Sequence, residues 1–491
     1  MSSTNASSEQ SSQPQNPRFA QRLGLFDATM IVMGGIIGSG IFINPYVVAT
    51  QVHTPMLILG AWLLGGLVAL AGAYIYAELA ARMPEVGGQY AYLREAYHPL
   101  VAFLYGWGLL LVIQSGGMAA VAVTFGRYFI ELTHVPFSDK TIATATLVLL
   151  VLVNCLGVRV GGTVQSVLMV LKILALVVLV ACGWLLVDDS QFVFTPMIDQ
   201  PVSFDLFMAI GAAMIPVLFA YGGWQTSNFI AAEIKEPKKN LPRALLFGVL
   251  GVIALYLAVN LVCVHALGAS GLANTATPAS AVMRLVLGEK GAAFIALGIT
   301  ISTLGFLSQG ILTAPRVYFA MAEDGVFFKR VAWLHPKTRV PVIAIILQGV
   351  LAIVIAYWGR YDQILNYVVS IDFIFFGLTA TCIWVFRRRD KQSVRTNALS
   401  TEETKVPGHP FTTLFFVAIC WLVVMNCVYK YPENTLIGLA ILLAGVPVYF
   451  LWKKTKIARG YSPLEGVLLR TAMHFYSLTM PSNTPWPPHE F

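Results

Sequence analysis

Long apolar blocks separated by short polar connections run through almost the whole chain. Blocks such as 167–186, 244–264 and 342–358 are nearly unbroken, which makes them too long for the core strands of a soluble protein. A helix needs about 20 residues to cross the hydrocarbon of a bilayer. The pattern therefore predicts about twelve transmembrane helices, at 27–49, 55–81, 98–130, 141–158, 163–187, 206–230, 243–268, 291–320, 341–358, 364–386, 411–430 and 435–452.

The positions of lysine and arginine predict how these spans are oriented. An even number of spans puts both termini on one side of the membrane. With the N-terminus inside, 25 of the 32 Lys and Arg residues lie in inside segments, one lies within a span, and the rest lie in or near outside segments. Because basic residues accumulate in cytoplasmic loops, we expect a multi-pass protein of the cell membrane with both termini cytoplasmic.

Composition excludes a soluble protein. Hydrophobic residues make up 57% of the chain and charged residues 11%, whereas about a quarter of the residues of a soluble domain are charged. The net charge of +8 is concentrated at 387–389 and 453–456, where contact with anionic headgroups of the lipid bilayer explains it, so no nucleic-acid partner is expected. The six cysteines all fall in predicted spans without metal-ligand spacing, so we expect no disulfide framework, metal site or cofactor.

Two predicted spans carry glycine clusters. The first span contains Gly-Gly-Ile-Ile-Gly-Ser-Gly at 34–40, and the sixth contains 220–224 shortly after Pro216. Glycine costs about 1 kcal/mol relative to alanine in a helix interior, so a helix can break there. Free peptide groups are tolerated inside a membrane only where they line a cavity. Breaks in spans one and six therefore predict an inverted repeat with a central polar site; close helix packing by small residues is the alternative.

Several motifs together resemble those of the amino acid-polyamine-organocation superfamily, close to its L-type amino acid transporters. The motifs are Gly38-Ser39-Gly40-Ile41-Phe42, Phe219-Ala220-Tyr221-Gly222-Gly223-Trp224, Glu78-Leu79 followed by Pro84, Gly87-Gly88 and Tyr90, Glu233 followed by Pro237, Lys238, Asn240, Pro242 and Arg243, and Pro315-Arg316 followed by Glu323-Asp324-Gly325.

The resemblance implies an all-α membrane protein of the LeuT type, with a five-plus-five inverted repeat and two further C-terminal helices. We expect one transporter domain over 23–455, with repeats at about 23–190 and 203–390 and extra helices over 411–453. A disordered cytoplasmic tail over 1–22 and a cytoplasmic tail over 456–491 would flank it. The implied function is amino acid transport by alternating access, not an enzymatic reaction.

The resemblance also implies where a substrate binds. The amides of Gly38, Ser39 and Gly40 and the Ser39 hydroxyl would hold a carboxylate. Carbonyls of the two breaks would hold the ammonium. These roles suit the positive end of a half-helix and free peptide oxygens. Phe219 would cover the substrate as a gate, or would be an ordinary packing aromatic. The carbonyls are those of Ile36, Phe219 and Gly222, and the site also includes Ile37, Ala220 and Gly223.

Two charged residues, Lys172 and Asp372, fall deep inside predicted spans, where an unpaired charge costs at least about 2.5 kcal/mol. The resemblance implies that Lys172 of span five replaces a sodium ion, with its ammonium near Gly34, Gly35 and Ser302 or Thr303; the alternative is that it reaches the inner headgroups. Asp372 of span ten is expected beside the substrate side chain, as a proton site, as a partner of a polar or cationic substrate, or as a structural acceptor.

Four further residues are candidates for coupling and gating. The Tyr256 hydroxyl is expected to reach the broken first helix, with packing as the alternative. Glu78, Glu233 and Arg316 lie at predicted cytoplasmic ends of spans, where they would form ion pairs that break on opening or act as ordinary helix-end charges.

The function expected from these features is sodium-independent exchange or uniport of neutral L-amino acids. A proton-coupled symporter that uses Asp372 is the alternative, and a nutrient receptor that has lost transport is a third possibility. The predicted outer loop 131–140 has no cysteine. Animal L-type transporters use a cysteine there to join a glycoprotein, so we expect no disulfide-linked heavy subunit.

Overall fold

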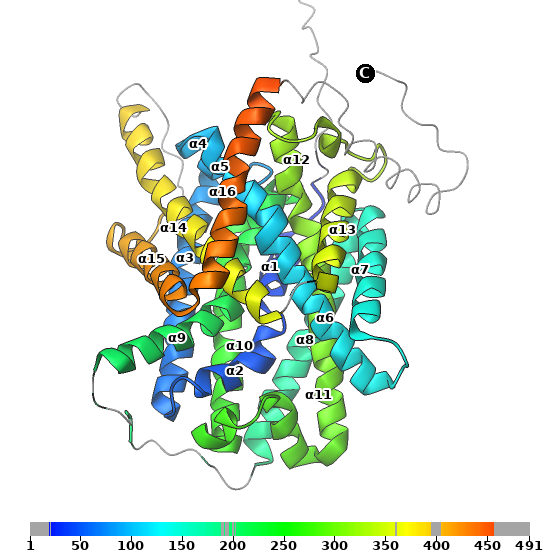
Figure 1. Ribbon diagram of the computed structural model, residues 1–491, viewed down its shortest axis with the longest axis vertical. Helices are drawn as coiled ribbons and strands as arrows, with labels where there is room; N and C mark the ends of the chain where they lie inside the picture. The colour runs from blue at the N-terminus through cyan, green and yellow to red at the C-terminus, as the bar shows by residue number, and fades with distance from the viewer. Residues whose placement is uncertain are drawn as a thin grey trace, which may run out of the picture.

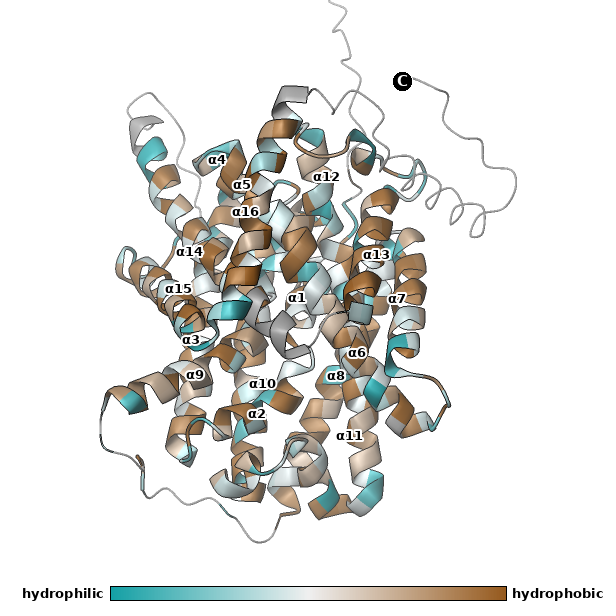
Figure 2. Ribbon diagram, viewed as in Figure 1, coloured by the Kyte–Doolittle hydropathy of each residue, from teal (hydrophilic) through white to brown (hydrophobic). Residues whose placement is uncertain are grey.

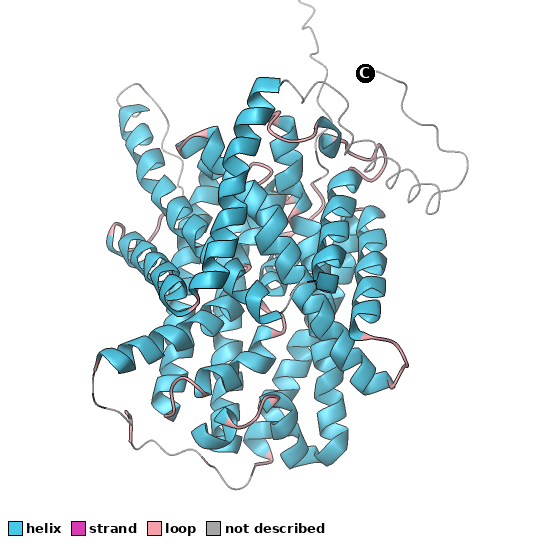
Figure 3. Ribbon diagram, viewed as in Figure 1, coloured by secondary structure: helices cyan, strands magenta, loops and turns pink. Residues whose placement is uncertain are grey.

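The computed structural model describes residues 19, 21–187, 191, 196–198, 201, 203–358, 361–393 and 404–455. All regular elements in this part of the chain are helices, joined by short loops (Figure 3). The α-helices are α1 (Leu25–Ile36), α2 (Gly40–Ala49), α3 (Pro55–Arg82), α4 (Gln89–Ala96), α5 (Pro99–Gly108), α6 (Gln114–Thr133), α7 (Asp139–Cys155), α8 (Val158–Leu185), α9 (Phe204–Tyr221), α10 (Pro237–Ala273), α11 (Pro278–Thr313), α12 (Pro315–Glu323), α13 (Val342–Trp358), α14 (Tyr361–Ser393), α15 (Phe411–Lys430) and α16 (Pro432–Thr455). A π-helix, η1 (Leu109–Ile113), joins α5 to α6, and two 3-10 helices are η2 (Trp224–Glu233) and η3 (Lys329–Ala332).

Capping side chains fix where several of these helices begin. Thr54, Ser138 and Ser203 each accept a hydrogen bond from the backbone amide three residues later, at 3.2–3.3 Å. The first amides of a helix have no partner within the helix, so such caps define the starts of α3, α7 and α9. Proline at the first position of α3 reinforces the start because its missing amide costs nothing there.

Ten helical segments of the described residues are long and apolar enough to cross a membrane. They coincide with ten of the predicted spans. The other two predicted spans coincide with α7 and α13, which have 17 residues each. At about 1.5 Å per residue these helices reach only about 26 Å, at the lower limit for a span. In addition, α14 extends beyond 386, the predicted end of span ten, and continues to Ser393.

The helices turn apolar side chains outward and polar side chains inward, as a bilayer requires. Helix α8 is an example, because Val167, Leu174 and Val177 are each about half exposed, whereas Gln165 and Lys172 on the same helix are fully buried. Figure 2 shows the apolar colour on the outer helices of the bundle. The outside of this bundle is therefore suited to lipid, and its polar chemistry is internal.

Both predicted helix breaks are present. The first span consists of α1 and α2, separated by residues 37–39, and the sixth consists of α9 and η2, separated by Gly222 and Gly223. Pro216 remains inside α9. The break follows it at Gly223, whose φ of +101° suits glycine. Helix α1 lies at the centre of the bundle in Figure 1, so the first break is internal.

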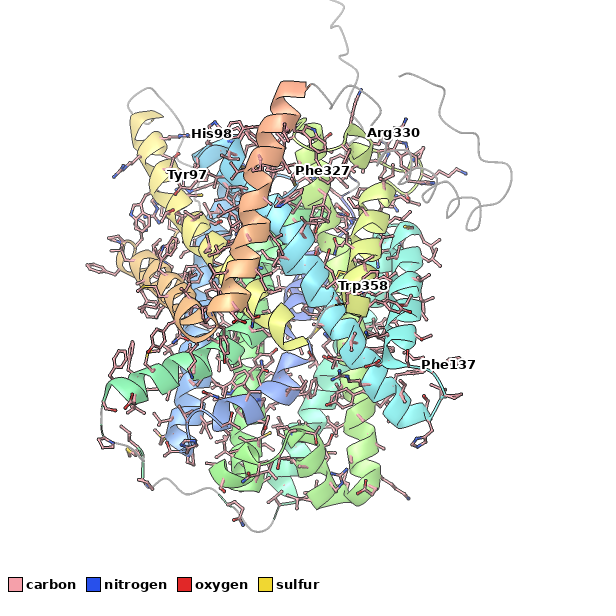
Figure 4. All side chains as sticks on the ribbon, in the orientation of Figure 1. Tyr97, His98, Phe137, Phe327, Arg330 and Trp358 are labelled. Atoms are coloured by element: carbon pink, nitrogen blue, oxygen red, sulfur yellow. The ribbon has the colours of Figure 1, made fainter. Side chains whose placement is uncertain are left out.

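Segments predicted to be cytoplasmic gather at one end of the bundle. Ion pairs join α3 to α14 through Arg82 and Asp390, and α4 to the end of α12 through Arg94 and Asp324. Figure 4 places His98 and Arg330 at this end, whereas Phe137, from a loop predicted to be outside, lies in the lower half of the view. We call the end that carries the ion pairs of Arg82 and Arg94 the charged end.

The predicted terminal tails lie largely outside the described residues. Within the described part, Phe19 is buried with its ring 5.0 Å from that of Phe319, measured between centroids. The amides of Arg22 and Leu23 donate to the Glu233 carbonyl at 3.0 and 3.1 Å. The segment just before α1 is therefore attached to the end of η2 and to α12.

Candidate functional site

At the first break, polar groups of the chain lack the hydrogen bonds of a regular helix. The Ile37 amide still donates to the Met33 carbonyl at 2.8 Å, but the chain then leaves α1 and restarts at Gly40. The Ser39 hydroxyl is buried and has no hydrogen-bond partner. Because the first amides of α2 have no carbonyl four residues earlier in helical position, residues 38–40 present unpaired donors at the positive end of a helix.

The second break packs directly against the first, and the contact is between the backbones of two glycines. A methyl group added at Gly223 would lie 2.0 Å from the Gly35 carbonyl oxygen, so only glycine permits this approach. The Gly223 amide donates to the Gln225 side chain at 3.0 Å, and the Thr226 hydroxyl donates to the Gly223 carbonyl at 2.6 Å. The Gln309 amide in turn donates to the Thr226 hydroxyl. Side chains of η2 and α11 therefore fix the backbone of the break.

Tyr256 of α10 bridges the two breaks. Its hydroxyl lies 3.2 Å from the Ile36 carbonyl and 3.2 Å from the Ala220 carbonyl. The predicted contact with the broken first helix is present, and the contact with the sixth span was not foreseen. The Ile36 carbonyl keeps one lone pair for a ligand.

A cavity of about 70 Å³ lies between the breaks, η1, α6, α11 and α14. Nine of the predicted site residues line it, whereas Ile37 does not, because its carbonyl accepts a hydrogen bond from Lys172 instead. The nine are Ile36, Gly38, Ser39, Gly40, Phe219, Ala220, Gly222, Gly223 and Asp372. Polar lining residues that the sequence reasoning missed are Gln114, Gln225, Thr226 and Gln309. Glutamine inside an apolar span was the available signal.

Lys172 lies on the other side of the first break and is fully buried. Its ammonium donates to the Ile37 carbonyl, two residues beyond the expected Gly35. The Ser302 hydroxyl donates to the next carbonyl, that of Gly38, at 3.1 Å. A methyl group at Gly305 would lie 2.9 Å from Lys172 Cε, so the absence of a side chain there makes room for the lysine. Lys172 and Ser302 thus both donate hydrogen bonds to carbonyls of the first break.

Asp372 of α14 lines the cavity, and its Oδ1 is buried without a hydrogen-bond partner. Val368, Val369 and Phe373 of the same helix are its neighbours in the cavity wall. A polar atom in such surroundings is costly unless something pairs with it.

At the charged end, the predicted gating residues belong to two separate ion-pair clusters. Arg316 of α12 bonds both carboxylate oxygens of Glu233, at 2.7 and 3.2 Å, and both side chains are 1% exposed. Glu78 instead accepts from Arg387 at 2.6 and 2.8 Å and from Arg82 at 3.2 Å. The three predicted gating residues therefore do not form one network.

A third cluster joins α4 to the loop after α12. Arg94 donates to both oxygens of Asp324 at 2.7 and 2.8 Å, and the Tyr90 hydroxyl donates to the same carboxylate at 2.8 Å. Burial lowers the pKa of the Arg94 guanidinium, but its bonds to Asp324 outweigh this and raise that pKa above its ordinary value. Burial and the Asp324 charge both raise the pKa of Tyr90. This cluster stays intact across the physiological pH range.

Comparison with known proteins identifies the family. Residues 23–446 match the family described as "Amino acid permease". The chain is 32% identical over 442 residues to the serine/threonine exchanger SteT of Bacillus subtilis (strain 168), covering 89% of this chain and 98% of the relative. It is 29% identical over 448 residues to the large neutral amino acids transporter small subunit 2 of Homo sapiens, covering 88% and 80%. It is 28% identical over 454 residues to the b(0,+)-type amino acid transporter 1 of Homo sapiens, covering 90% of each.

These matches extend over both helix breaks and the cavity between them. Their family consists of membrane transporters and not of enzymes. This chain is a multi-pass membrane protein and belongs to the amino acid permease family of the amino acid-polyamine-organocation superfamily.

Proposed function

We propose that the protein exchanges or equilibrates neutral L-amino acids across the membrane by alternating access, without sodium. The observation that carries this proposal is the contact between Gly35 and Gly223, which joins two broken helices around one cavity. The names of the relatives, which include a serine/threonine exchanger and a large neutral amino acids transporter, support the substrate class.

In this proposal the substrate is a zwitterion whose two charged groups hydrogen-bond to the free peptide groups of the two breaks. Its carboxylate accepts hydrogen bonds from the amides of Gly38, Ser39 and Gly40 and from the unpartnered Ser39 hydroxyl. Its ammonium donates to carbonyls of the breaks, at Ile36, Phe219 and Gly222. The positive end of α2 favours the carboxylate electrostatically, and Phe219, which lines the cavity, covers the bound substrate.

Lys172 supplies the fixed positive charge that takes the place of a coupling ion. Its ammonium already bonds the Ile37 carbonyl at the back of the first break, where a cation would otherwise be needed to neutralise the carbonyl dipoles. A lysine side chain in this place makes the break independent of the sodium concentration, which suits an exchanger or uniporter.

The proposed architecture is twelve spans in a five-plus-five inverted repeat with two C-terminal helices, and both termini cytoplasmic. Helices α7 and α13 cross the membrane in spite of their 17 residues each, because about 17 residues is the lower limit for a span. The charged end then faces the cytoplasm, and its ion pairs open and close the inner entrance.

The chain is proposed to work without a disulfide-linked heavy subunit. The loop between α6 and α7, where animal L-type transporters carry the linking cysteine, has none. The six cysteines lie in helices and are unpaired in the structure.

Exchange in proteoliposomes tests the proposed function. Purified protein is reconstituted with unlabelled alanine inside, and uptake of labelled alanine is followed with sodium or potassium as the only external cation. The proposal predicts equal uptake in both solutions, and uptake that depends on internal alanine or on its gradient. Uptake only in sodium would contradict the proposed role of Lys172, and no uptake of any amino acid would contradict the function itself.

A proton-coupled symporter is the second candidate, favoured by the unpartnered Asp372 carboxyl at the cavity. An inward pH gradient would then concentrate alanine in vesicles, and Asp372→Asn would abolish accumulation while retaining exchange. If the pH gradient drives no accumulation, this candidate is excluded.

A further inference from the structure

In the proposed binding mode, the carboxylate and ammonium of the substrate lie at the two helix breaks. Another wall of the cavity is then left for the substrate's side chain. Helix α14 contributes Val368, Val369 and Phe373 to this wall, and Ile113 and Val121 come from η1 and α6. All five are apolar. A substrate whose head is held at the two breaks would turn its side chain toward a wall of this kind.

One carboxyl group interrupts this apolar wall. Asp372 lines the cavity between the apolar residues of α14, and its Oδ1 has no hydrogen-bond partner. Within the described part of the chain, no side chain donates a hydrogen bond to this oxygen. The buried Tyr105 hydroxyl of α5 has no partner at all and does not bond Asp372, and Lys172 and Ser302 donate to carbonyls of the first break. A substrate in the cavity that carries a donor on its side chain would supply the missing hydrogen bond.

The size of the cavity limits what that donor is. A water molecule occupies about 10–15 Å³ when space is measured in this way, so a cavity of about 70 Å³ has room for about five to seven such atoms. Alanine already has six non-hydrogen atoms, so an amino acid with one atom beyond Cβ is the upper limit without rearrangement. Lysine, arginine and the aromatic amino acids are too large, whereas serine fits and threonine and valine each exceed the limit by one atom.

We propose that Asp372 accepts a hydrogen bond from the side-chain hydroxyl of the transported substrate, and so selects small hydroxyl-bearing amino acids over aliphatic ones of equal size. This inference rests on the proposed function, because it assumes that an amino acid occupies the cavity. Asp372 is thereby a specificity residue of the site.

The size of the selection follows from the cost of an unpaired buried polar group. Threonine and valine have nearly the same shape, so they fill the cavity equally. Valine leaves the Asp372 carboxyl unpaired and excludes the water that would otherwise pair with it, whereas threonine supplies a donor. The corresponding preference for threonine is about 5- to 150-fold in apparent dissociation constant.

The test compares isosteric substrates in the purified full-length protein. Apparent dissociation constants of threonine, valine, serine and alanine are measured by competition against labelled alanine uptake, for the parent and for three variants. Asp372→Asn keeps an acceptor oxygen in place. Asp372→Leu removes it with little change in volume. Thr379→Val alters a buried residue of the same helix that does not line the cavity, and it serves as the control.

The proposal predicts that the parent and Thr379→Val prefer threonine to valine and serine to alanine. Asp372→Asn retains the preference in reduced form. Asp372→Leu loses the preference but still takes up valine, which also demonstrates that the variant folds. Should Asp372→Leu fail to fold, the parent and Asp372→Asn still decide the matter.

Two results would overturn the inference while leaving the proposed function intact. One is uptake by the parent with equal affinity for threonine and valine. The other is an unchanged threonine-to-valine ratio in Asp372→Leu. Absence of uptake for every amino acid would instead overturn the proposed function, and the inference with it.

Discussion

The centre of the bundle and its charged end differ in how their buried polar groups are paired. At the centre, polar atoms such as the Ser39 hydroxyl and Asp372 Oδ1 are buried without partners. At the charged end, Glu233 and Arg316 are equally buried but bonded to each other through two hydrogen bonds. The two cavity-lining atoms are open to a ligand, whereas the Glu233 carboxylate is paired within the protein by Arg316. Substitutions at the two places should therefore have different consequences.

The largest effect is expected where the two breaks touch. Gly223→Val puts a branched side chain at φ +101° and within contact of the Gly35 carbonyl. We expect loss of exchange, and a stability loss in which backbone strain of about 1–3 kcal/mol adds to an overpacking cost of about 1–3 kcal/mol. Gly60→Ala is the control, because a methyl group there meets no atom within 4 Å. Alanine exchange and the thermal unfolding midpoint of both variants are measured, and a functional Gly223→Val protein would refute the contact.

The next effect is expected at the charged end. Glu233→Gln leaves the Arg316 charge buried and uncompensated, which costs about 3–5 kcal/mol. The double variant Glu233→Gln/Arg316→Met removes both charges and should be more stable than the single variant. Thermal unfolding in detergent measures this difference. If both variants unfold at the same temperature as the parent, the pair does not stabilise the closed end.

A smaller effect, on binding and not on stability, is expected behind the first break. Lys172→Met removes the donor to the Ile37 carbonyl, so alanine affinity should fall about tenfold because a charged hydrogen bond that shapes the break is lost. Lys140→Met is a matched control, since Lys140 also donates to a backbone carbonyl, that of Tyr357, but at an exposed position. Equal loss of affinity in both variants would show that Lys172 has no special role.

The smallest effect is expected at the surface of the charged end. Arg389 and Glu95 form an ion pair at 3.0 Å, but both side chains are about half exposed. Solvent screens such a pair, so Glu95→Gln should change stability by less than about 1 kcal/mol. Its unfolding midpoint is compared with that of Glu233→Gln. A comparable loss in the two variants would mean that burial does not distinguish the clusters.

The sequence predicted features that depend on local composition. The lengths of the apolar blocks predicted ten of the spans. The glycine clusters predicted both breaks, because the backbone at Gly223 accommodates only glycine. The sequence did not predict which side chains meet across the bundle. The contacts of Gln309 with Thr226 and of Tyr256 with the sixth span join residues 83 and 36 positions apart. Glu78 and Glu233 resembled one another along the chain, yet three-dimensional packing gave them different arginine partners.

The central claim is that two broken helices together hold the two ends of a zwitterion, and analogues of alanine test it most directly. Ethylamine lacks the carboxylate, and propionate lacks the ammonium. Thermal stabilisation of the purified protein is measured with each compound over the same concentration range, because a ligand that binds only the folded state raises its stability by mass action. The account predicts stabilisation by alanine and none by either analogue. Stabilisation by ethylamine or propionate equal to that by alanine would contradict it.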